Sequence, residues 1–541
     1  MHVRHRRFPK LHLRAWLPLG LALLGTRGVA AAPELVVWRP AELPPFTASQ
    51  AHAWDEFPLQ VEFTHRASGR TLRVDAFWDS GRRWRVRYAL PAAGEWCWEA
   101  RSGDPQLRGR GCVAAREPTA AERAANPSYR GHLRVSANRR YFERADGTPF
   151  LYVGDTLWAL NSLNASADTR GRGNFYRWAG DRRRKGFTLA QAAAFIEFPN
   201  EAGHAFPARV WSNLNAAFFR ASDRRFAHLW EQGFVVALHP TWITTTDMRL
   251  PEAVAVSRYV YARYGAYSLV WSLTGEYNLD HAKPYWREDR FAALRALGRE
   301  MQAINERAYR HPMSVHPAGG NPAADGAFSS HYVMHREPWL DHNWLQTYRF
   351  VERVVPELQR AYRTPEPKPV VLAEPCYENA GDCDADTMRL QAWTAFLAGA
   401  AGFVYGAEGV YYLDDVRALR LPGSRHMKHL VDFFRRLEWW TLDPTIGCVR
   451  FEGDPPEHDM PAQPRCAGNP GHVFVVYIPS GSRRSRAMEV IGLVGGSYAA
   501  SWFDPRSGRY RPLRRGPRAV DSWRVPRPPD DRDWVLLLER R

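Results

Sequence analysis

The sequence lacks most of the short motifs that identify common enzyme classes. It contains no GxSxG nucleophile elbow, no HExxH zinc motif and no GxxxxGK[ST] phosphate loop. It also contains no CxxC pair, and its cysteines and histidines are not spaced as in a zinc site. These absences argue against serine esterases, zinc peptidases and nucleotidases. We therefore expect no metal ion and no cofactor.

Long apolar runs are missing after the first 30 residues, so we expect no later segment to cross a membrane. The N-terminus has the pattern of an export signal, in which basic residues precede the apolar run 15–25 and the small residues 28–32. We predict a signal peptide over residues 1–32 and a periplasmic or extracellular protein. A retained N-terminal anchor is the alternative, although the apolar run is about half as long as a membrane span.

Cysteine is scarce, with 6 residues in a chain of 541. The six fall into three pairs whose members are close in sequence, and an exported protein can keep disulfides. Other pairings are formally possible, so closeness along the chain is the sole argument for our choice. The predicted disulfides are Cys97–Cys112, Cys376–Cys383 and Cys448–Cys466.

Acidic residues are outnumbered, with 57 Asp and Glu against 74 Lys and Arg, which gives a net charge of +17. The arginine-rich segment 481–541 favours attraction to an acidic polysaccharide or an anionic cell surface, unless it reflects composition alone. The basic residues form no recognisable nucleic-acid-binding motif, so we expect no nucleic-acid partner. The chain is rich in aromatic residues, including 22 Trp and 22 Tyr. Such rings either fill cores or stack on sugars.

Strand patterns at both ends of the chain flank a central region of different character. Residues 33–118 contain short β-branched and aromatic runs separated by Gly- and Pro-containing turns, which predicts an antiparallel β-sandwich. Residues 116–130 are polar and predict a linker. Residues 440–541 return to the first pattern and predict a second β-sandwich, with a hairpin turn at 504–508.

The central region, residues 133–435, alternates short apolar runs with helical stretches such as 216–232, 287–307 and 386–399. The number and spacing of these repeats predict an α/β fold, the (β/α)8 or TIM barrel. A doubly wound sheet is the structural alternative, but no Gly-rich phosphate turn follows the first run. The apolar runs are 150–158, 187–195, 234–242, 269–277, 313–319, 345–348, 370–374 and 402–406.

Two glutamates, Glu276 and Glu374, lie at the carboxyl ends of the fourth and seventh apolar runs. In a (β/α)8 barrel the carboxyl ends of the strands form the active-site face, so both side chains are expected over one pocket. Glycoside hydrolysis needs such a pair, one carboxyl to protonate the leaving oxygen and one to act at the anomeric carbon. Alternatively, a glutamate in this position pairs with an arginine or caps a loop. Glu378 and Glu408 lie near the same face and stay open as ligands, structural partners or catalytic groups.

Polar and aromatic residues at the other strand ends are candidates for sugar binding. We expect His239 and His316 to hydrogen bond or pack, because no ligand-spaced set of side chains accompanies them. The predicted substrate-binding residues are Asp155, Trp158, Gln191, His239, Trp242, Asn278, His316, Gln346, Tyr348, Tyr405 and Glu408.

Residues 133–435 resemble the apiosidase-like glycoside hydrolases, the DUF4038 barrel family. The resemblance implies a barrel of the large retaining-glycosidase clan, with its acid/base at Glu276 and its nucleophile at Glu374. It also implies that Asp155 lies at a substrate-binding position. The motifs that carry it are 152–158 (YVGDTLW), 270–276 (VWSLTGE), 316–319 (HPAG), 374–378 (EPCYE) and 399–406 (GAAGFVYG).

The flanking parts resemble domains that accompany such barrels. The N-terminal part is similar to the DUF5060 β-sandwich, through 77–78 (FW), 84–88 (WRVRY) and 94–96 (GEW). The C-terminal part is similar to a β-domain provisionally named collagen-binding, through 502–505 (WFDP) and Gly508. No residue of that domain selects collagen.

The barrel departs from the family pattern at several pocket positions. Thr274 replaces a frequent Gly, Glu276 a frequent Asp, and Thr188 an Asn near the second strand. The usual Gln-Ser-Gly-His near the sixth strand is here 346–349 (QTYR). Because these residues would line the pocket, the resemblance does not imply that the sugar is apiose.

We therefore predict an exported retaining glycoside hydrolase that acts on a plant or bacterial polysaccharide or oligosaccharide. Two other functions fit the same sequence. A polysaccharide-binding or surface-adhesion protein on a degenerate barrel would keep the aromatic residues without needing both glutamates. A polysaccharide lyase would need a base beside a uronic acid. The sequence gives no oligomeric state.

Overall fold

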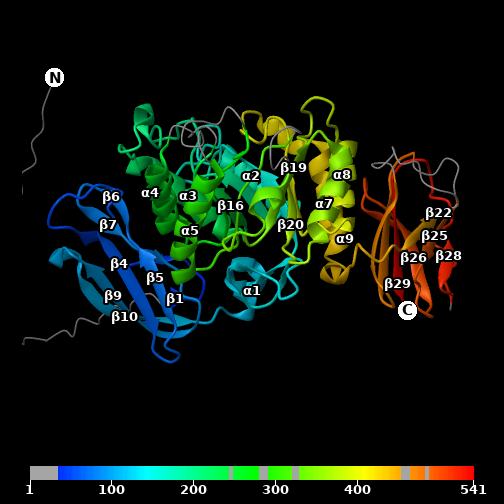
Figure 1. Ribbon diagram of the computed structural model, residues 1–541, viewed down its shortest axis with the longest axis horizontal. Coiled ribbons are helices and arrows are strands. Elements are labelled where there is room, and N and C mark those ends of the chain that lie inside the picture. Colours follow the sequence, from blue (N-terminus) through cyan, green and yellow to red (C-terminus); the bar gives the residue numbers. More distant parts are fainter. Residues whose placement is uncertain are drawn as a thin grey trace, which may run out of the picture. The chain divides into compact units, whose positions relative to one another are not determined.

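The computed structural model describes residues 35–242, 248–279, 290–319, 328–451, 463–481, 487–518 and 520–541. The predicted signal peptide, residues 1–32, lies outside the described residues. Leu35–Arg541 forms one compact unit. It contains antiparallel β-domains near both ends of the chain and a (β/α)8 barrel between them in sequence, which confirms the predicted fold class (Figure 1).

The N-terminal β-domain encloses one apolar core between a five-stranded sheet, of order β1-β10-β9-β4-β5, and two smaller sheets. Val61 and Phe63 on β4 are fully buried and alternate with the partly exposed Gln60 and Glu62, as a strand with one buried face requires. The strands are β1 Leu35–Val36, β2 Ala41–Glu42, β3 Phe46–Thr47, β4 Leu59–His65, β5 Thr71–Asp75, β6 Phe77–Ser80, β7 Arg83–Arg85, β8 Arg87–Tyr88, β9 Gly94–Ser102 and β10 Gly109–Arg116.

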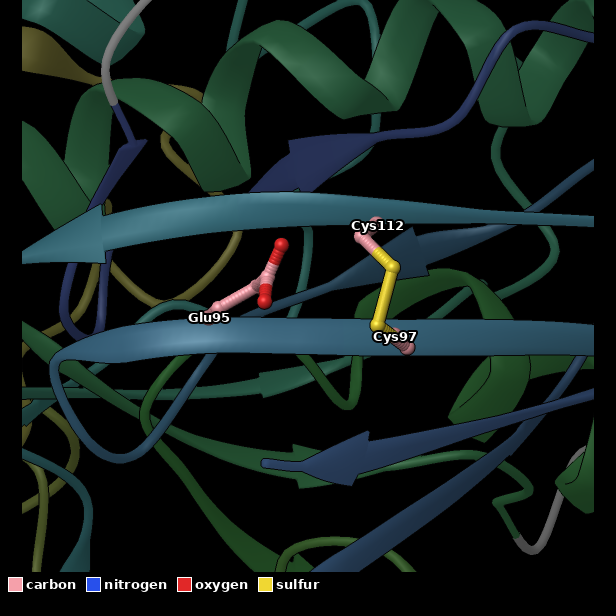
Figure 2. A group of neighbouring side chains, drawn as sticks. All are labelled: Glu95, Cys97 and Cys112. Atoms are coloured by element: carbon pink, nitrogen blue, oxygen red, sulfur yellow. A yellow bond between two sulfur atoms is a disulfide. The ribbon is translucent and has the colours of Figure 1, made fainter. Parts of the chain in front are cut away.

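A disulfide joins the neighbouring strands β9 and β10 through Cys97 and Cys112, which are directly opposite each other (Figure 2). Together with Glu95 they form a group of side chains compact enough to surround a metal ion. Metal binding needs a thiolate, and both sulfurs are already bonded to each other, so this group is not a metal site. The other two predicted disulfides, Cys376–Cys383 and Cys448–Cys466, are also present.

The segment predicted as a linker is partly folded. It contains the short helix α1, Ala120–Ala125, which begins with a capping box formed by Thr119 and Glu122. Ser128 donates a hydrogen bond to the carbonyl oxygen of Trp230 at 2.8 Å, which ties the segment to the barrel. The three-stranded sheet that follows was not predicted, and it shares a core with the barrel interior. Its strands are β11 Leu133–Val135, β12 Phe142–Arg144 and β13 Pro149–Phe150.

Eight parallel strands form the barrel in the order β18-β17-β16-β15-β14-β21-β20-β19, and each coincides with one predicted apolar run. Ser314 on β18 donates to the carbonyl oxygen of His342, next to β19, at 2.8 Å and so brings the outer strands of this order together. The strands are β14 Tyr152–Thr156, β15 Leu189–Ala193, β16 Val235–His239, β17 Leu269–Ser272, β18 Met313–Ser314, β19 Asn343–Tyr348, β20 Val370–Pro375 and β21 Gly402–Tyr405.

Helices follow most barrel strands (Figure 1). The helices predicted at 216–232 and 386–399 are α3 and α8. The helix predicted at 287–307 is α5, whose described part starts at Arg290. In the described ranges, no helix has the length and hydrophobicity that crossing a membrane would require. The helices are α2 Asn174–Arg184, α3 Ala216–Glu231, α4 Leu250–Tyr264, α5 Arg290–Arg307, α6 His331–Met334, α7 Val354–Tyr362, α8 Ala385–Leu397 and α9 Pro422–Phe434.

The C-terminal β-domain consists of a five-stranded sheet, of order β23-β24-β29-β26-β27, and a three-stranded sheet, of order β22-β25-β28. The predicted strand 473–478 is β24, and the predicted turn at 504–508 joins β26 to β27. The strands are β22 Val449–Phe451, β23 Arg465–Asn469, β24 Val473–Ile478, β25 Met488–Ile491, β26 Tyr498–Asp504, β27 Arg509–Pro512, β28 Ser522–Arg524 and β29 Trp534–Arg540.

Candidate active site

The alternation of side chains along the barrel strands decides which predicted site residues reach the interior. Successive residues of a strand face opposite sides of a sheet. On β14, Tyr152 belongs to the interior core and Val153 to the outer core between strands and helices, so Asp155 also faces outward. On β21, Val404 faces the interior and Tyr405 faces the outer core.

Asp155 and Tyr405 therefore face away from the barrel interior, which contradicts the prediction that they bind substrate. Asp155 is fully buried, and its carboxylate lies 2.6 Å from Arg182 Nε on α2. Tyr405 donates a hydrogen bond to Glu378, which also accepts from the backbone N–H of Gly423 in α9. These contacts hold helices to the barrel, so Glu378 is structural as well.

A bulge in β20 turns Glu374 toward the barrel mouth. Leu345 on β19 pairs with Leu372, but the next residue, Gln346, pairs with Glu374, so Ala373 is an extra residue in β20. Ala373 belongs to the interior core, and regular alternation would turn the residue after it outward. The bulge instead places Glu374 opposite Gln346. The side chain of Gln191 supports this arrangement by donating to the Ala373 carbonyl oxygen at 2.9 Å.

Glu276 lies four residues beyond the end of β17 and begins a turn in which the backbone N–H of Leu279 donates to its carbonyl oxygen at 3.2 Å. Its φ of 50° is in the left-handed region, which is strained for residues other than glycine and is typical of functional sites. A Cβ atom on the preceding Gly275 would lie 2.0 Å from the ring of Trp242. The glycine therefore allows Trp242 to pack directly against the turn that carries Glu276.

Gln346 and His316 connect the two glutamates. Gln346 Nε2 donates to Glu276 Oε1 at 3.3 Å, and Gln346 Oε1 lies 3.1 Å from His316 Nε2. The same imidazole nitrogen lies 3.0 Å from Glu374 Oε2. The Gln346 amide and the His316 imidazole thus connect the carboxyl of Glu276 to that of Glu374. The site brings together four residues that the sequence predicted there.

The two carboxyls have different surroundings. Burial, and then the negative charge of Glu374, raise the pKa of Glu276, whereas His316 and Gln346 oppose this shift. Tyr377 donates its hydroxyl hydrogen bond to Glu374 and accepts one from Trp158 Nε1 at 2.9 Å. Burial and the charge of Glu374 raise the pKa of the Tyr377 phenol far above its usual range, so the donor keeps its proton. A carboxyl with a raised pKa beside a second, hydrogen-bonded carboxyl is the combination that acid-assisted substitution needs.

Aromatic rings enclose the carboxyls. The rings of Trp158 and Trp242 have their centroids 4.3 Å apart, and each lies within 6 Å of His316. His239 packs against both tryptophans and against Trp344, which was not predicted as a site residue. The wall of the site next to the acidic pair is therefore aromatic, and Trp242, which stays partly exposed, offers a ring on which a sugar can stack.

The remaining predicted residues have varied positions. Asn278 is fully buried and accepts from the backbone N–H of Ala318 at 2.6 Å, so it supports the loop after β18. Tyr348 is 38% exposed at the end of β19. Glu408 is exposed and accepts from the Tyr411 hydroxyl at 3.1 Å. Contact of these three residues with a substrate stays a prediction.

Two tyrosines at the site were not predicted. Tyr377 lies three residues beyond Glu374, in a loop where strand alternation no longer applies. Tyr412 is 37% exposed, and burial together with the charges of Glu276 and Glu374 raises the pKa of its phenol. The aromatic run 411–412 after the eighth strand is the one sequence signal that could have indicated it.

Three families match consecutive parts of the chain. The apiosidase-like catalytic domain matches residues 136–441, and the domain of unknown function DUF5060 matches residues 34–103. A domain provisionally described as the collagen-binding domain of a collagenase matches residues 461–539. No protein with a curated description matches the chain.

Solved structures share the fold at low sequence identity. A Bacteroides vulgatus protein, provisionally described as a glycoside hydrolase, is 16% identical with a TM-score of 0.69, and the match covers 94% of this chain and 99% of that one. A glycoside hydrolase family 5 protein from the same species is 19% identical with a TM-score of 0.62, covering 76% and 94%. A third protein, named as a glycoside hydrolase, is 20% identical with a TM-score of 0.61, covering 76% and 98%.

Proposed function

Because the chain belongs to the apiosidase-like family and is a glycoside hydrolase, we propose that Glu276 and Glu374 perform a retaining reaction on its carbohydrate substrate. The observation that carries this proposal is the link from Glu276 through Gln346 and His316 to Glu374, with hydrogen-bond-length distances at each step. The raised pKa of Glu276 supports its role as the acid.

The reaction has two steps. Protonated Glu276 donates its proton to the leaving oxygen while the Glu374 carboxylate attacks the anomeric carbon and forms a glycosyl ester. Glu276, now deprotonated, then takes a proton from a water molecule that attacks the same carbon and releases Glu374. Tyr377 and His316 hold the Glu374 carboxylate in position, and Gln346 orients Glu276.

The substrate that we propose is a plant or bacterial polysaccharide or oligosaccharide. The family name makes apiosides the first substrates to test, although Glu276 and Thr274 differ from the frequent family residues. We also propose that the protein works outside the cytoplasm, because its three disulfides persist in an oxidising compartment.

The experiment compares wild-type protein with the variants Glu276→Gln and Glu374→Gln on a panel of aryl glycosides that includes apiosides, and on pectic oligosaccharides. Loss of the acid is expected to lower kcat by about 10²–10⁴-fold, and loss of the nucleophile by at least as much. Glu300→Gln, an exposed glutamate on α5, is the matched control and should keep full activity.

Two results would contradict the proposal. A wild-type protein that binds these glycans but releases no sugar would indicate a non-catalytic binding protein. A product with an unsaturated sugar end would indicate a polysaccharide lyase.

A further inference from the structure

A second pocket opens in the loop that follows β15. Loops after barrel strands lie on the active-site face, so this pocket and the two carboxyls share that face. Its volume is about 270 Å³, just below the roughly 300–1,000 Å³ of sites for drug-sized ligands. A single sugar unit therefore suits its size. Its lining includes Phe195, Glu197, Phe206, Ala208, Arg209 and Trp211.

Three aromatic rings form the apolar part of this pocket. The centroid of Phe206 lies 5.2 Å from the centroids of both Phe195 and Trp211. Trp54 of the N-terminal β-domain packs edge-on against Phe206 and donates to the carbonyl oxygen of Ser212 at 3.1 Å. Trp54 thus anchors the loop at Phe206 and Ser212, on either side of Trp211 in sequence. The ring of Trp211 packs on Phe206 and remains partly exposed.

An ion pair forms the polar part. Arg209 Nη1 lies 3.1 Å from Glu197 Oε1, and the two side chains are 48% and 59% exposed. Ala208 and Arg209 both have left-handed backbones, with φ of 54° and 56°, a strained conformation that is frequent at ligand sites. The pair offers donors and acceptors to hydroxyl groups while keeping this region neutral, which suits an uncharged sugar better than a uronic acid.

The pocket is connected to the carboxyls by an aromatic contact. Phe198, one residue beyond Glu197, meets Tyr412 edge-on with ring centroids 5.2 Å apart. Tyr412 in turn lies close enough to Glu276, Glu374 and Glu197 for all three charges to raise the pKa of its phenol, after the larger effect of burial. Tyr412 and Phe198 therefore stand between the carboxyl pair and the second pocket.

We propose that the pocket lined by Phe206, Arg209 and Trp211 binds a second, uncharged sugar unit of the same oligosaccharide whose bond is cleaved at Glu276 and Glu374. This inference rests on the proposed function and adds to it that the substrate has at least two sugar units. Trp211 supplies the face on which the second sugar stacks, and Glu197 and Arg209 bind its hydroxyl groups.

The test compares Trp211→Ala with wild type on two substrates that share a terminal sugar. One is the aryl glycoside of that sugar, and the other is a pectic oligosaccharide in which that sugar is linked to a second, uncharged sugar. Loss of a stacked ring is expected to raise KM for the oligosaccharide about ten-fold and to leave the aryl glycoside unchanged. Arg209→Ala, which leaves the aromatic wall in place, should act in the same direction. Trp523→Ala, a partly exposed tryptophan of the C-terminal β-domain, is the control.

An equal change on both substrates, or no change on either, would overturn the inference. Binding of the pectic oligosaccharides to Glu276→Gln and to Glu276→Gln/Trp211→Ala, measured by calorimetry, separates this result from a failure of the proposed function. If wild type hydrolyses no substrate, weaker binding by the double variant still supports the pocket. Equal binding by the two variants contradicts it.

Discussion

The pKa of Glu276 depends on the charge of Glu374. Glu374 lies beside Nε2 of His316 and accepts a hydrogen bond from the hydroxyl of Tyr377. Glu276 is largely buried, and His316 and the Gln346 amide oppose the rise in its pKa that burial and the charge of Glu374 cause. In such a pair, a charge on one carboxyl makes ionisation of the other less favourable. The sequence alone could indicate the two glutamates but not the difference between their surroundings. Tyr377 and the Gln346 amide on β19 come close to them only in the folded chain.

Replacing Glu374 by Gln should lower the pKa of Glu276. The variant removes the negative charge that helps to raise this pKa, and it keeps the shape of the side chain. The shift is measured by ¹³C NMR titration of the glutamate side-chain carboxyls, with the Glu276 signal assigned from Glu276→Gln. An unchanged or higher pKa in Glu374→Gln would mean that the two carboxyls do not interact.

Glu276→Gln should be more stable than wild type at neutral pH. The folded-state pKa of Glu276 lies above its unfolded-state value, so above the folded pKa the wild type carries a buried charge that costs stability. As pH falls through the folded pKa, the wild type regains this stability, and the difference disappears below the unfolded value of about 4.3. Thermal unfolding at several pH values measures the effect.

The exposed Glu300→Gln should show no such trend. A variant Glu276→Gln that is less stable than wild type at neutral pH would contradict the expected cost of burying this carboxyl.

At the level of strands and helices, sequence patterns predicted the positions of all eight barrel strands because each is a short apolar run. Strand alternation was available from the sequence too. Because every second residue of a strand faces the same side, Asp155 does not share the inward face of Tyr152, and Tyr405 does not share that of Val404. The bulge at Ala373 could not be predicted, because it depends on how β20 pairs with β19. Glu374 reaches the pocket as a result of that pairing.

Asp155→Asn should destabilise the protein without a specific effect on substrate binding. Arg182 is fully buried and would lose its charged partner on β14, although Asp181 remains 2.6 Å away. Breaking a buried ion pair in this way lowers the free energy of unfolding by about 3 kcal/mol. Chemical denaturation measures the loss, and KM measured well below the unfolding temperature should stay at the wild-type value.

The pair of Arg134, which is 56% exposed, and Glu143 provides the control at the surface, since Glu143→Gln should cost about 0–1 kcal/mol. A stable Asp155→Asn protein with a raised KM would restore Asp155 as a substrate ligand.

At the scale of the whole chain, composition and turn patterns predicted two β-domains around a barrel. They could not predict how tightly these parts are connected, because the connecting residues are far apart in sequence. Arg87 on β8 is almost fully buried and contacts Asp223 on α3. Asp533, next to β29, forms a two-bond pair with Arg389 on α8, and each side chain is 3% exposed. The segment predicted as a linker is partly folded for a related reason, since Ser128 is fixed by a residue 102 positions away.

Asp533→Asn should lower the stability of the barrel as well as that of the C-terminal β-domain. The substitution leaves Arg389 buried with one remaining carboxylate partner, Asp386, which is itself exposed. The free energy of unfolding is expected to fall by about 3 kcal/mol. Hydrogen exchange measures this as weaker protection of the backbone amides of helix α8. Protection of α8 that stays at the wild-type level in Asp533→Asn would show that the two parts unfold independently.

Covalent labelling tests the central claim most directly. The wild-type protein is incubated with a 2-deoxy-2-fluoro glycoside that has a good leaving group and carries the sugar of the best aryl glycoside. Peptide mass spectrometry then identifies the modified residue. Our account predicts a glycosyl ester on Glu374, and a faster loss of the label when an acceptor sugar is added. A label on another residue, or an unlabelled protein whose product has inverted anomeric configuration, would contradict it.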